Sequence, residues 1–227
     1  MPPDIQSVNI GGQSIVFIDN FLQDPQALVE TACQSLFGPP AGLAEQKGYP
    51  GLRAGAPAAY TQTLTELLDP LIKVNFQVPE HLDVKVGLSA FSLTTTPPEE
   101  LGPLQRMPHF DASTPHHMAA MFWLCDESHG GAGFYRHNAT GYQRITAENR
   151  EHYLDVCHEE VNRRLPPARY FDRSDDRYTF LGMMPARFNR LVVYPGSLLH
   201  SACINPVRSL SSDPRQGRLT VNTFYDF

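Results

Sequence analysis

The chain has 227 residues, which is enough for one domain with a sizeable hydrophobic core. Its 18 Lys and Arg against 24 Asp and Glu give a formal net charge of −6, so it has no excess of basic residues to neutralise a nucleic-acid backbone. With 41% hydrophobic and 19% charged residues, the composition excludes a disordered chain or a coiled coil. The 20 prolines and 16 glycines indicate many turns and favour a β-rich fold over a long helical bundle.

No targeting or disulfide pattern is evident. The first apolar run, residues 15–18, is too short for a secretory signal or a membrane span. Four cysteines are scattered without a CxxC pair, which favours reduced thiols over disulfides or a zinc site; they are Cys33, Cys125, Cys157 and Cys203. We therefore expect a cytoplasmic protein with no membrane or nucleic-acid partner, whose oligomeric state the sequence leaves open.

The N-terminal third is expected to combine one strand with two helices. Residues 14–19 (SIVFID) predict a strand, and the Asp24-Pro25 pair predicts the start of a helix over residues 25–35. Residues 38–59, rich in Gly, Pro and Ala, are typical of a loop. Residues 62–76 carry leucines at helical spacing, so this segment predicts a helix whose leucine stripe packs on a sheet.

The rest of the chain is dominated by short apolar or alternating segments separated by turns. The expected strands are residues 83–93, 118–125, 133–136, 190–194 and 218–225. This rhythm is typical of an antiparallel barrel or sandwich. A helix is expected over residues 146–164, and the polar, proline-containing residues 163–188 are expected to fold over a site as a lid.

Two histidines and one aspartate form the first candidate site. In the segment Met107-Pro-His-Phe-Asp111, side chains at i and i+2 of an extended chain share one side, so His109 and Asp111 could chelate one metal ion. His200 follows an apolar strand, a Pro-Gly turn and a short second strand that it ends. Two imidazoles and one carboxylate with open positions suit non-haem Fe(II). The alternatives are an exposed His–Asp pair and a hydrogen-bonded histidine at the rim of the fold.

The C-terminal strand carries the second candidate site. Alternation in residues 217–225 places Arg218, Thr220 and Asn222 on one face. Arg218 would then project into the interior, where its planar guanidinium suits a carboxylate and the Thr220 hydroxyl can add a hydrogen bond. The alternative is an internal salt bridge to one of the protein's own acids.

Over about residues 84–227, the order and spacing of these motifs resemble the 2-oxoglutarate/Fe(II)-dependent dioxygenase superfamily. The shared pattern is HxD, a strand ending in a Gly-Gly turn, a Pro-Gly turn before the distal His, and an Arg-x-Ser/Thr strand. The resemblance implies that His109, Asp111 and His200 bind Fe(II). The N-terminal residues are similar to a mostly uncharacterised bacterial branch of this superfamily.

The resemblance further implies that Arg218 and Thr220 bind the C5 carboxylate of 2-oxoglutarate. The gap between His200 and Arg218 is longer than in many members, so the loop arginines Arg208 and Arg215 remain alternative partners of that carboxylate. We favour Arg218, because a strand position points inward and a loop arginine is more often solvated.

The fold class implied by the resemblance is mainly β with flanking helices, a double-stranded β-helix of the jelly-roll or cupin type. No internal repeat or linker divides the chain, so residues 1–227 are expected to form one domain. In it, residues 1–83 supply a strand and helices that pack on the barrel. Residues 84–227 form the core, with a helical or lid insertion at about 141–188.

The function implied by the resemblance is an oxygenase that uses Fe(II), 2-oxoglutarate and O2 on a small molecule or peptide. Relatives that halogenate have a small residue where this chain has Asp111, so hydroxylation or another oxidation is expected. The alternatives are a non-catalytic cupin-like module that binds a metal or a carboxylate, and a hydrolase or isomerase that uses Zn(II) or Mn(II) on the same barrel.

Three residues after the Gly-Gly turn are candidate substrate contacts: Tyr135, Arg136 and His137. His116 and His117 are neighbours, whose side chains face opposite ways in a strand, so a shared metal is not expected. Trp123, the single tryptophan, stands in the middle of a predicted strand and is expected in the core.

Overall fold

The computed structural model describes residues 4–40 and 48–227. Part of the segment predicted as a loop, residues 41–47, lies outside the described residues. The strands are β1 (Ile5–Ile10), β2 (Gln13–Asp19), β3 (Gly51–Gly55), β4 (Lys85–Thr94), β5 (Met118–Trp123), β6 (Gly130–His137), β7 (Tyr178–Pro185), β8 (Arg190–Pro195), β9 (His200–Ile204) and β10 (Leu219–Asp226). The α-helices are α1 (Pro25–Cys33), α3 (Ala58–Phe76), α4 (Arg150–Arg163) and α5 (Pro206–Ser209), and the 3₁₀ turns are η1 (Pro98–Glu100), η2 (Pro103–Arg106) and η3 (Glu127–His129).

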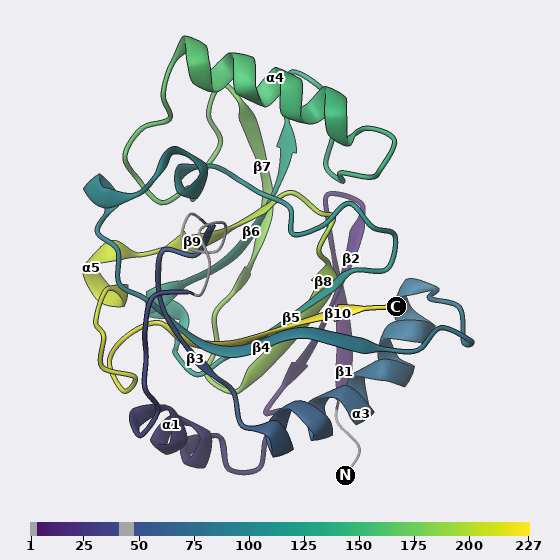
Figure 1. The fold of residues 1–227 in the computed structure, drawn as a ribbon, viewed down its shortest axis with the longest axis vertical. Coiled ribbons are helices and arrows are strands. Elements are labelled where there is room, and N and C mark those ends of the chain that lie inside the picture. The colour runs from purple at the N-terminus through teal and green to yellow at the C-terminus, as the bar shows by residue number, and fades with distance from the viewer. Residues whose placement is uncertain (1–3, 41–47) are drawn as a thin grey trace.

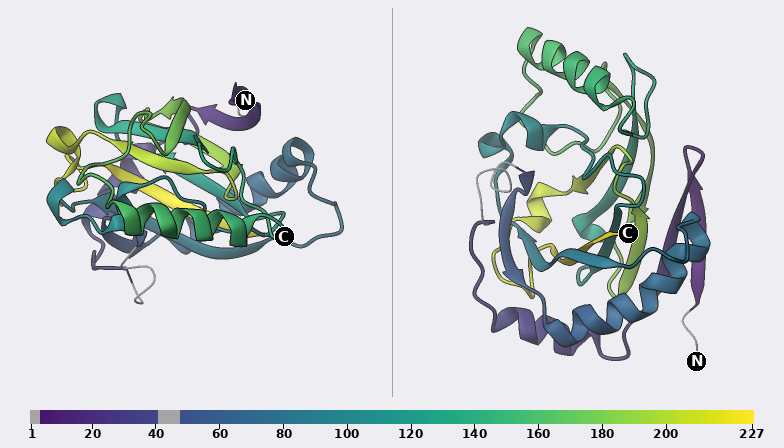
Figure 2. Two further views of the ribbon diagram at one scale, coloured as in Figure 1. Left: turned by 90° about the horizontal axis from the view of Figure 1, so that it is seen from above. Right: turned by 45° about the vertical axis from the view of Figure 1, so that its right-hand side comes forward.

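The described strands form two antiparallel sheets (Figure 1). The larger sheet has the order β1-β2-β8-β5-β10-β4-β3, and the smaller has the order β7-β6-β9. Helices α1 and α3 lie at one end of the molecule and α4 at the other, as both Figure 1 and the right panel of Figure 2 show. The predicted mainly-β class with flanking helices, of the double-stranded β-helix type, is confirmed.

The outer face of the larger sheet packs against α1 and α3. Apolar side chains of α3 at helical spacing, among them Leu64 and Leu68, join Phe91, Phe122 and Val221 of the sheet in one buried cluster. Asp24 caps α1 by accepting from the backbone N–H of Ala27, as the Asp-Pro pair predicts. The predicted packing of N-terminal helices outside one sheet is therefore observed.

The inner face of the larger sheet meets the smaller sheet. Trp123 of β5 and Tyr194 of β8 pack with Phe134 of β6 in a second buried cluster. Directly opposite residues of neighbouring strands share a face. The pairing register therefore places one row of side chains on this inner face, namely Arg190, Trp123, Thr220, Ser92 and Arg53.

Several sequence predictions about elements were wrong. Residues 38–59 are not a loop throughout, because β3 pairs there with β4 at the edge of the sheet. Strand β1 was not expected, since its side chains are mostly exposed and show no apolar pattern. The lid prediction for residues 163–188 is wrong over β7, which hydrogen-bonds to β6. His200 begins β9 and does not end the strand before it.

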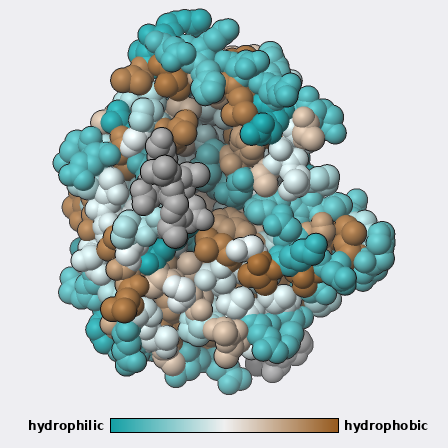
Figure 3. All heavy atoms as spheres, viewed as in Figure 1, coloured by the Kyte–Doolittle hydropathy of each residue, from teal (hydrophilic) through white to brown (hydrophobic). Residues whose placement is uncertain are grey.

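The surface seen in Figure 3 is mainly hydrophilic, with hydrophobic side chains scattered in small groups. None of the helices within residues 4–40 and 48–227 has the length and apolar character needed to cross a membrane.

Candidate metal centre

The backbone brings His109 and His200 together. The His109 N–H donates to the His200 carbonyl oxygen and the His200 N–H donates to the His109 carbonyl oxygen, both at 2.8 Å. These two bonds form an isolated antiparallel bridge. Two residues on, the Asp111 N–H donates to the Gly196 carbonyl oxygen at 2.7 Å, which holds this segment extended. The i, i+2 spacing therefore turns His109 and Asp111 to the same side, next to His200.

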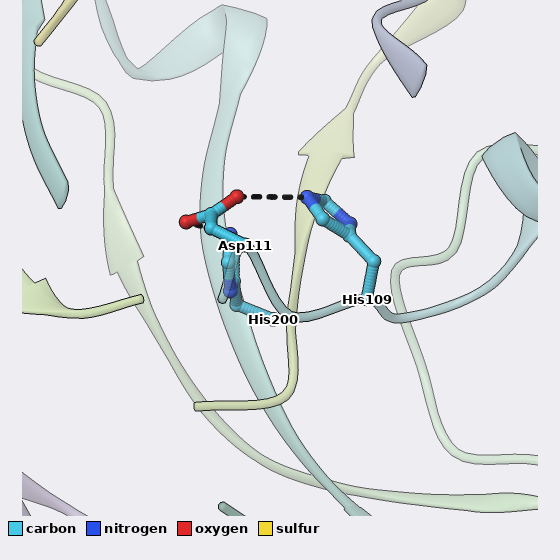
Figure 4. Close-up of side chains that lie close together, drawn as sticks. All are labelled: His109, Asp111 and His200. Atoms are coloured by element: carbon cyan, nitrogen blue, oxygen red, sulfur yellow. Dashed lines mark ion pairs between the residues drawn. The ribbon is translucent and has the colours of Figure 1, made fainter. Parts of the chain in front are cut away.

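The three side chains meet at one point. One ligand atom from each of His109, Asp111 and His200 lies within 4.8 Å of the others. The two oxygens of Asp111 face one ring each: Oδ1 is 3.8 Å from His109 Nε2, and Oδ2 is 3.6 Å from His200 Nε2. Figure 4 shows the Asp111 carboxylate turned toward the His109 ring. The side chains of Asp111 and His200 are 15% and 6% exposed, whereas that of His109 is 54% exposed and forms the open side of the cluster.

Both imidazoles are prepared to act as neutral ligands. His200 Nδ1 lies 2.8 Å from the Leu198 carbonyl oxygen, so Nδ1 carries the proton and Nε2 offers its lone pair to the cluster. Burial lowers the pKa of His200 to about 4. Burial and then the neighbouring His200 lower the pKa of His109 as well, although the solvated edge of His109 weakens this effect. At neutral pH both rings are uncharged and can coordinate a cation.

The buried position of Asp111 destabilises its negatively charged form when no cation is bound. Burial raises its pKa, opposed first by His109 and then by His117 and Arg53. Its Oδ2 is buried and accepts no hydrogen bond from any described residue. A buried carboxylate oxygen without a donor costs free energy, and a bound metal ion removes that cost.

Gly196 allows Asp111 to approach His117. A Cβ built on Gly196 would lie 2.5 Å from His117 Cδ2 and 3.1 Å from Asp111 Oδ2, so only glycine fits here. His117 Nδ1 pairs with Asp226 Oδ1 at 2.8 Å and is not one of the three clustered ligands.

Arg218 and Thr220 face the space between the sheets. Arg218 is 2% exposed, and its Nη2 donates to the Gly131 carbonyl oxygen at 3.3 Å. Its buried Nε has no partner among the residues that the structure describes. Thr220 is fully buried, and its hydroxyl donates to the Ser92 carbonyl oxygen at 3.5 Å.

The two alternative arginines lie elsewhere. Arg208 is exposed at α5. Arg215 is exposed and pairs with Glu30 on α1, on the outer side of the larger sheet. Of the three arginines, only Arg218 combines burial with an unused donor.

Tyr194 connects the metal cluster with Arg218. Its ring lies 5.0 Å from the His200 ring in an edge-to-face arrangement. Burial and then the charge of Asp111 raise the pKa of Tyr194, and the charge of Arg218 opposes them. The hydroxyl of Tyr194 therefore lies in the electrostatic field of both the Asp111 carboxylate and the Arg218 guanidinium.

Of the three residues suggested as substrate contacts, two are buried and one is exposed. Tyr135 is fully buried, and its hydroxyl donates to the Phe171 carbonyl oxygen at 3.0 Å. His137 is fully buried between Thr140 and Glu160, with a ring nitrogen 2.9 and 3.1 Å from each. Arg136 is exposed. Tyr135 and His137 therefore have their polar groups engaged inside the protein.

Sequence reasoning did not identify Arg53 or Tyr194 as neighbours of the site. Arg53 lies on β3, whose composition is that of a loop, and its charge reaches Asp111 only because β3 pairs with β4. Tyr194 belongs to the Tyr-Pro-Gly motif, which signals the turn but not the direction of the phenol. Both positions depend on strand register.

Comparison with solved structures finds several that are similar to this chain. HygX from Streptomyces hygroscopicus, solved with nickel, 2-oxoglutarate and hygromycin B bound, is 11% identical, with 94% of this chain and 82% of HygX covered and a TM-score of 0.50. SnoN, a non-heme alpha ketoglutarate dependent epimerase from nogalamycin biosynthesis, is 13% identical, with 94% and 78% covered and a TM-score of 0.49. AviO1 from Streptomyces viridochromogenes Tue57 is 14% identical, with 93% and 89% covered and a TM-score of 0.48.

The likeness to HygX concerns the fold, and it agrees with the double-stranded β-helix that the sequence predicts. No curated protein matches the chain. Residues 1–225 match a family described as "Family of unknown function (DUF6445)".

Proposed function

The chain belongs to the DUF6445 family, and we propose that it is an Fe(II)- and 2-oxoglutarate-dependent oxygenase that oxidises a small molecule or a peptide. The observation that carries the proposal is the convergence of His109, Asp111 and His200 within 4.8 Å, from segments far apart in the chain. Two imidazoles and one carboxylate on one side of a metal are the ligand set of non-haem Fe(II) oxygenases.

The residues present fit a divalent cation. His109 and His200 are neutral near pH 7, and Asp111 has a buried oxygen that no described residue donates to. A cation bonded to that oxygen compensates for its loss of solvent. The open edge of His109 leaves one side of the cluster accessible to other ligands.

Arg218 supports 2-oxoglutarate as the co-substrate. Transfer of a guanidinium into the interior is costly unless an anion accompanies it. No described carboxylate lies within 4.0 Å of Arg218, and its Nε is unused, so a carboxylate from a bound molecule would complete its environment. Thr220, on the same inner face, adds a hydroxyl to that environment.

In this function Fe(II), when bound, supplies the chemistry by which O2 oxidises both 2-oxoglutarate, to succinate and CO2, and a C–H bond of the second substrate. The residues of the chain contribute by positioning the metal and the co-substrate. His109, Asp111 and His200 would hold the metal, Arg218 and Thr220 would orient the co-substrate, and the apolar cluster between the two sheets excludes water from this region. Because Asp111 occupies the third ligand position, we propose hydroxylation or a related oxidation and not halogenation.

The test is succinate production from 2-oxoglutarate with Fe(II) and ascorbate, by the wild type and by Asp111→Ala. We expect succinate from the wild type and background levels from the variant. Asp69→Ala is the matched control, because Asp69 pairs with Lys73 on the outer helix α3, and we expect it to retain activity.

Calorimetry separates the proposed enzyme from its alternatives. If the wild type binds neither metal nor 2-oxoglutarate, the oxygenase proposal is wrong. Binding of both without succinate formation in the presence of a broad panel of small molecules and peptides would instead favour the non-catalytic module. Preference for Zn(II) or Mn(II) without any effect of 2-oxoglutarate would favour a hydrolase or isomerase.

A further inference from the structure

Trp123 is a buried indole with an unused donor. It is the single tryptophan of the chain and is 0% exposed, on the inner face of β5. Its Nε1 is buried and has no hydrogen-bond partner in the described part of the chain. Buried tryptophans usually hydrogen-bond their N–H, because leaving such a donor without a partner costs free energy. Packing in the apolar core therefore does not explain why this position carries a side chain with an N–H donor.

The strand register places Trp123 beside the two residues proposed to bind the co-substrate. Trp123 is directly opposite Thr220 on β10, so their side chains lie next to each other on the same face. Arg218 stands two residues before Thr220 and is therefore the diagonal neighbour of Trp123 on that face.

Contacts of the Arg218 guanidinium agree with this position. Its Nη2 is 3.9 Å from the sulfur of Met121, two residues before Trp123 on the same face of β5. Its charge also acts on Cys125, two residues after Trp123, where it opposes the rise in the thiol pKa caused by burial. A guanidinium that influences the residues on both sides of Trp123 lies alongside the indole.

Two buried donors without partners, Nε1 of Trp123 and Nε of Arg218, thus occupy neighbouring positions between the sheets. A carboxylate has two oxygens and can accept from both donors at once. We propose that Trp123 binds the distal carboxylate of the co-substrate, donating its indole N–H to one oxygen while Arg218 binds the other. The inference rests on the proposed function, and it makes Trp123 a determinant of specificity for 2-oxo acids that carry a second carboxylate.

The first test compares the affinity of Trp123→Phe and wild type for 2-oxoglutarate, measured by calorimetry with Ni(II) in place of iron. Phenylalanine keeps an aromatic ring but has no donor. A hydrogen bond to a charged group contributes enough that we expect roughly a tenfold weaker Kd. Ni(II) affinity alone is expected to stay unchanged, because Trp123 is not one of the clustered ligands.

A matched control distinguishes a lost donor from a disturbed core. Phe122→Leu alters the preceding residue of β5, which is equally buried but faces α3 on the outer side of the sheet. We expect it to lower stability without changing the Kd for 2-oxoglutarate. Pyruvate is the second control, since it has the 2-oxo acid group but no distal carboxylate. Trp123→Phe should leave pyruvate binding unchanged, whereas a general disturbance of the site would weaken both ligands.

Tryptophan fluorescence tests the inference in the unaltered protein and remains informative if Trp123→Phe does not fold. All tryptophan emission comes from Trp123, so 2-oxoglutarate should change it at the concentrations that give calorimetric binding, and pyruvate should not. Binding of 2-oxoglutarate with neither an emission change nor a weaker Kd in the folded variant would overturn the role of Trp123 and leave the proposed function standing. Failure of the wild type to bind 2-oxoglutarate would overturn both.

Discussion

At the scale of single residues, Arg218 is a buried charge with no oppositely charged partner among the described residues. Its guanidinium is buried with one carbonyl oxygen and one sulfur as partners, and no described carboxylate is within reach. Such a group destabilises the fold unless a ligand supplies the missing charge. Functional sites commonly contain residues that lower the stability of the fold, and a buried charge without a partner is one example.

We expect Arg218→Gln to weaken 2-oxoglutarate binding by roughly 30-fold or more, because loss of one partner of a buried ion pair costs about 2–5 kcal/mol. The thermal midpoint of the ligand-free variant should not fall, since an unpaired buried charge is removed. Arg215→Gln is the control, as it removes only an exposed pair with Glu30. Calorimetry that gives equal losses for both variants would contradict the assignment of Arg218.

Gly196 gives a second residue-scale prediction. In Gly196→Ala the new Cβ would lie 2.5 Å from His117 Cδ2, so that ring must shift, and 3.1 Å from Asp111 Oδ2, which is tight enough to displace the carboxylate slightly. Because a displaced ligand lowers affinity, we expect at least a roughly tenfold weaker Kd for Ni(II) by calorimetry. Gly55→Ala on β3 serves as control, since a Cβ there meets no atom within 4 Å. Unchanged affinity in Gly196→Ala would show that the glycine is not needed for the ligand geometry.

At the scale of elements, the sequence predicts those strands whose own pattern is apolar or alternating. Strands β5, β8 and β10 are of this kind, because each is buried against neighbours on both sides. Edge strands behave differently: β1 is polar and exposed, and β3 has the composition of a loop. Their structure comes from pairing with β2 and β4, which is information that lies elsewhere in the chain.

The pair Asp19 and Arg190 adds a side-chain link at one end of the β2–β8 ladder. Arg190 donates from Nε to Oδ1 at 2.6 Å and from Nη2 to Oδ2 at 2.9 Å, and Arg187 adds a bond at 3.0 Å. The hydrogen bond from Arg190 lowers the pKa of Asp19. We expect Asp19→Asn to reduce the free energy of unfolding by about 2 kcal/mol at pH 7, because bonds to a charged group are lost.

The pH dependence of this loss has a definite sign. A carboxyl whose pKa is lower in the folded state stabilises fully above its unfolded pKa of about 3.9 and loses that contribution as the pH falls through the folded value. The difference between wild type and Asp19→Asn should therefore be constant near neutrality and shrink below about pH 4. Denaturant unfolding across this range checks it, and a difference that persists at low pH would contradict the role of the charge.

At the scale of the whole molecule, the candidate metal site joins parts of the chain that the sequence places far apart. His109 and Asp111 precede β5, whereas His200 begins β9 in the other sheet. The motifs predict which residue types belong together, since HxD and a later histidine suit one metal. The 3.6 Å distance between Asp111 Oδ2 and His200 Nε2 follows only from the tertiary structure. The position of Trp123 beside Thr220 follows only from the register of β5 and β10 in the larger sheet.

A metal bound at this junction should stabilise the entire fold. At a concentration about 100 times its Kd, a ligand that binds only the folded state adds about 2.7 kcal/mol, which raises Tm by roughly 5–10 °C in a protein of this size. We expect that shift for the wild type with Ni(II) in a thermal denaturation experiment. Asp111→Ala should show little or none, and an equal shift in that variant would place the metal elsewhere.

The pair of reciprocal peptide hydrogen bonds between His109 and His200 has a consequence for how this scaffold can diversify. Sliding that pairing by one residue would turn an imidazole away, so its register is constrained, whereas α4 lies outside both sheets. Insertions or replacements around α4 can then accumulate without shifting the ligand atoms. Descendants of one ancestral sequence could in this way exchange the molecules they accept while preserving a single reaction.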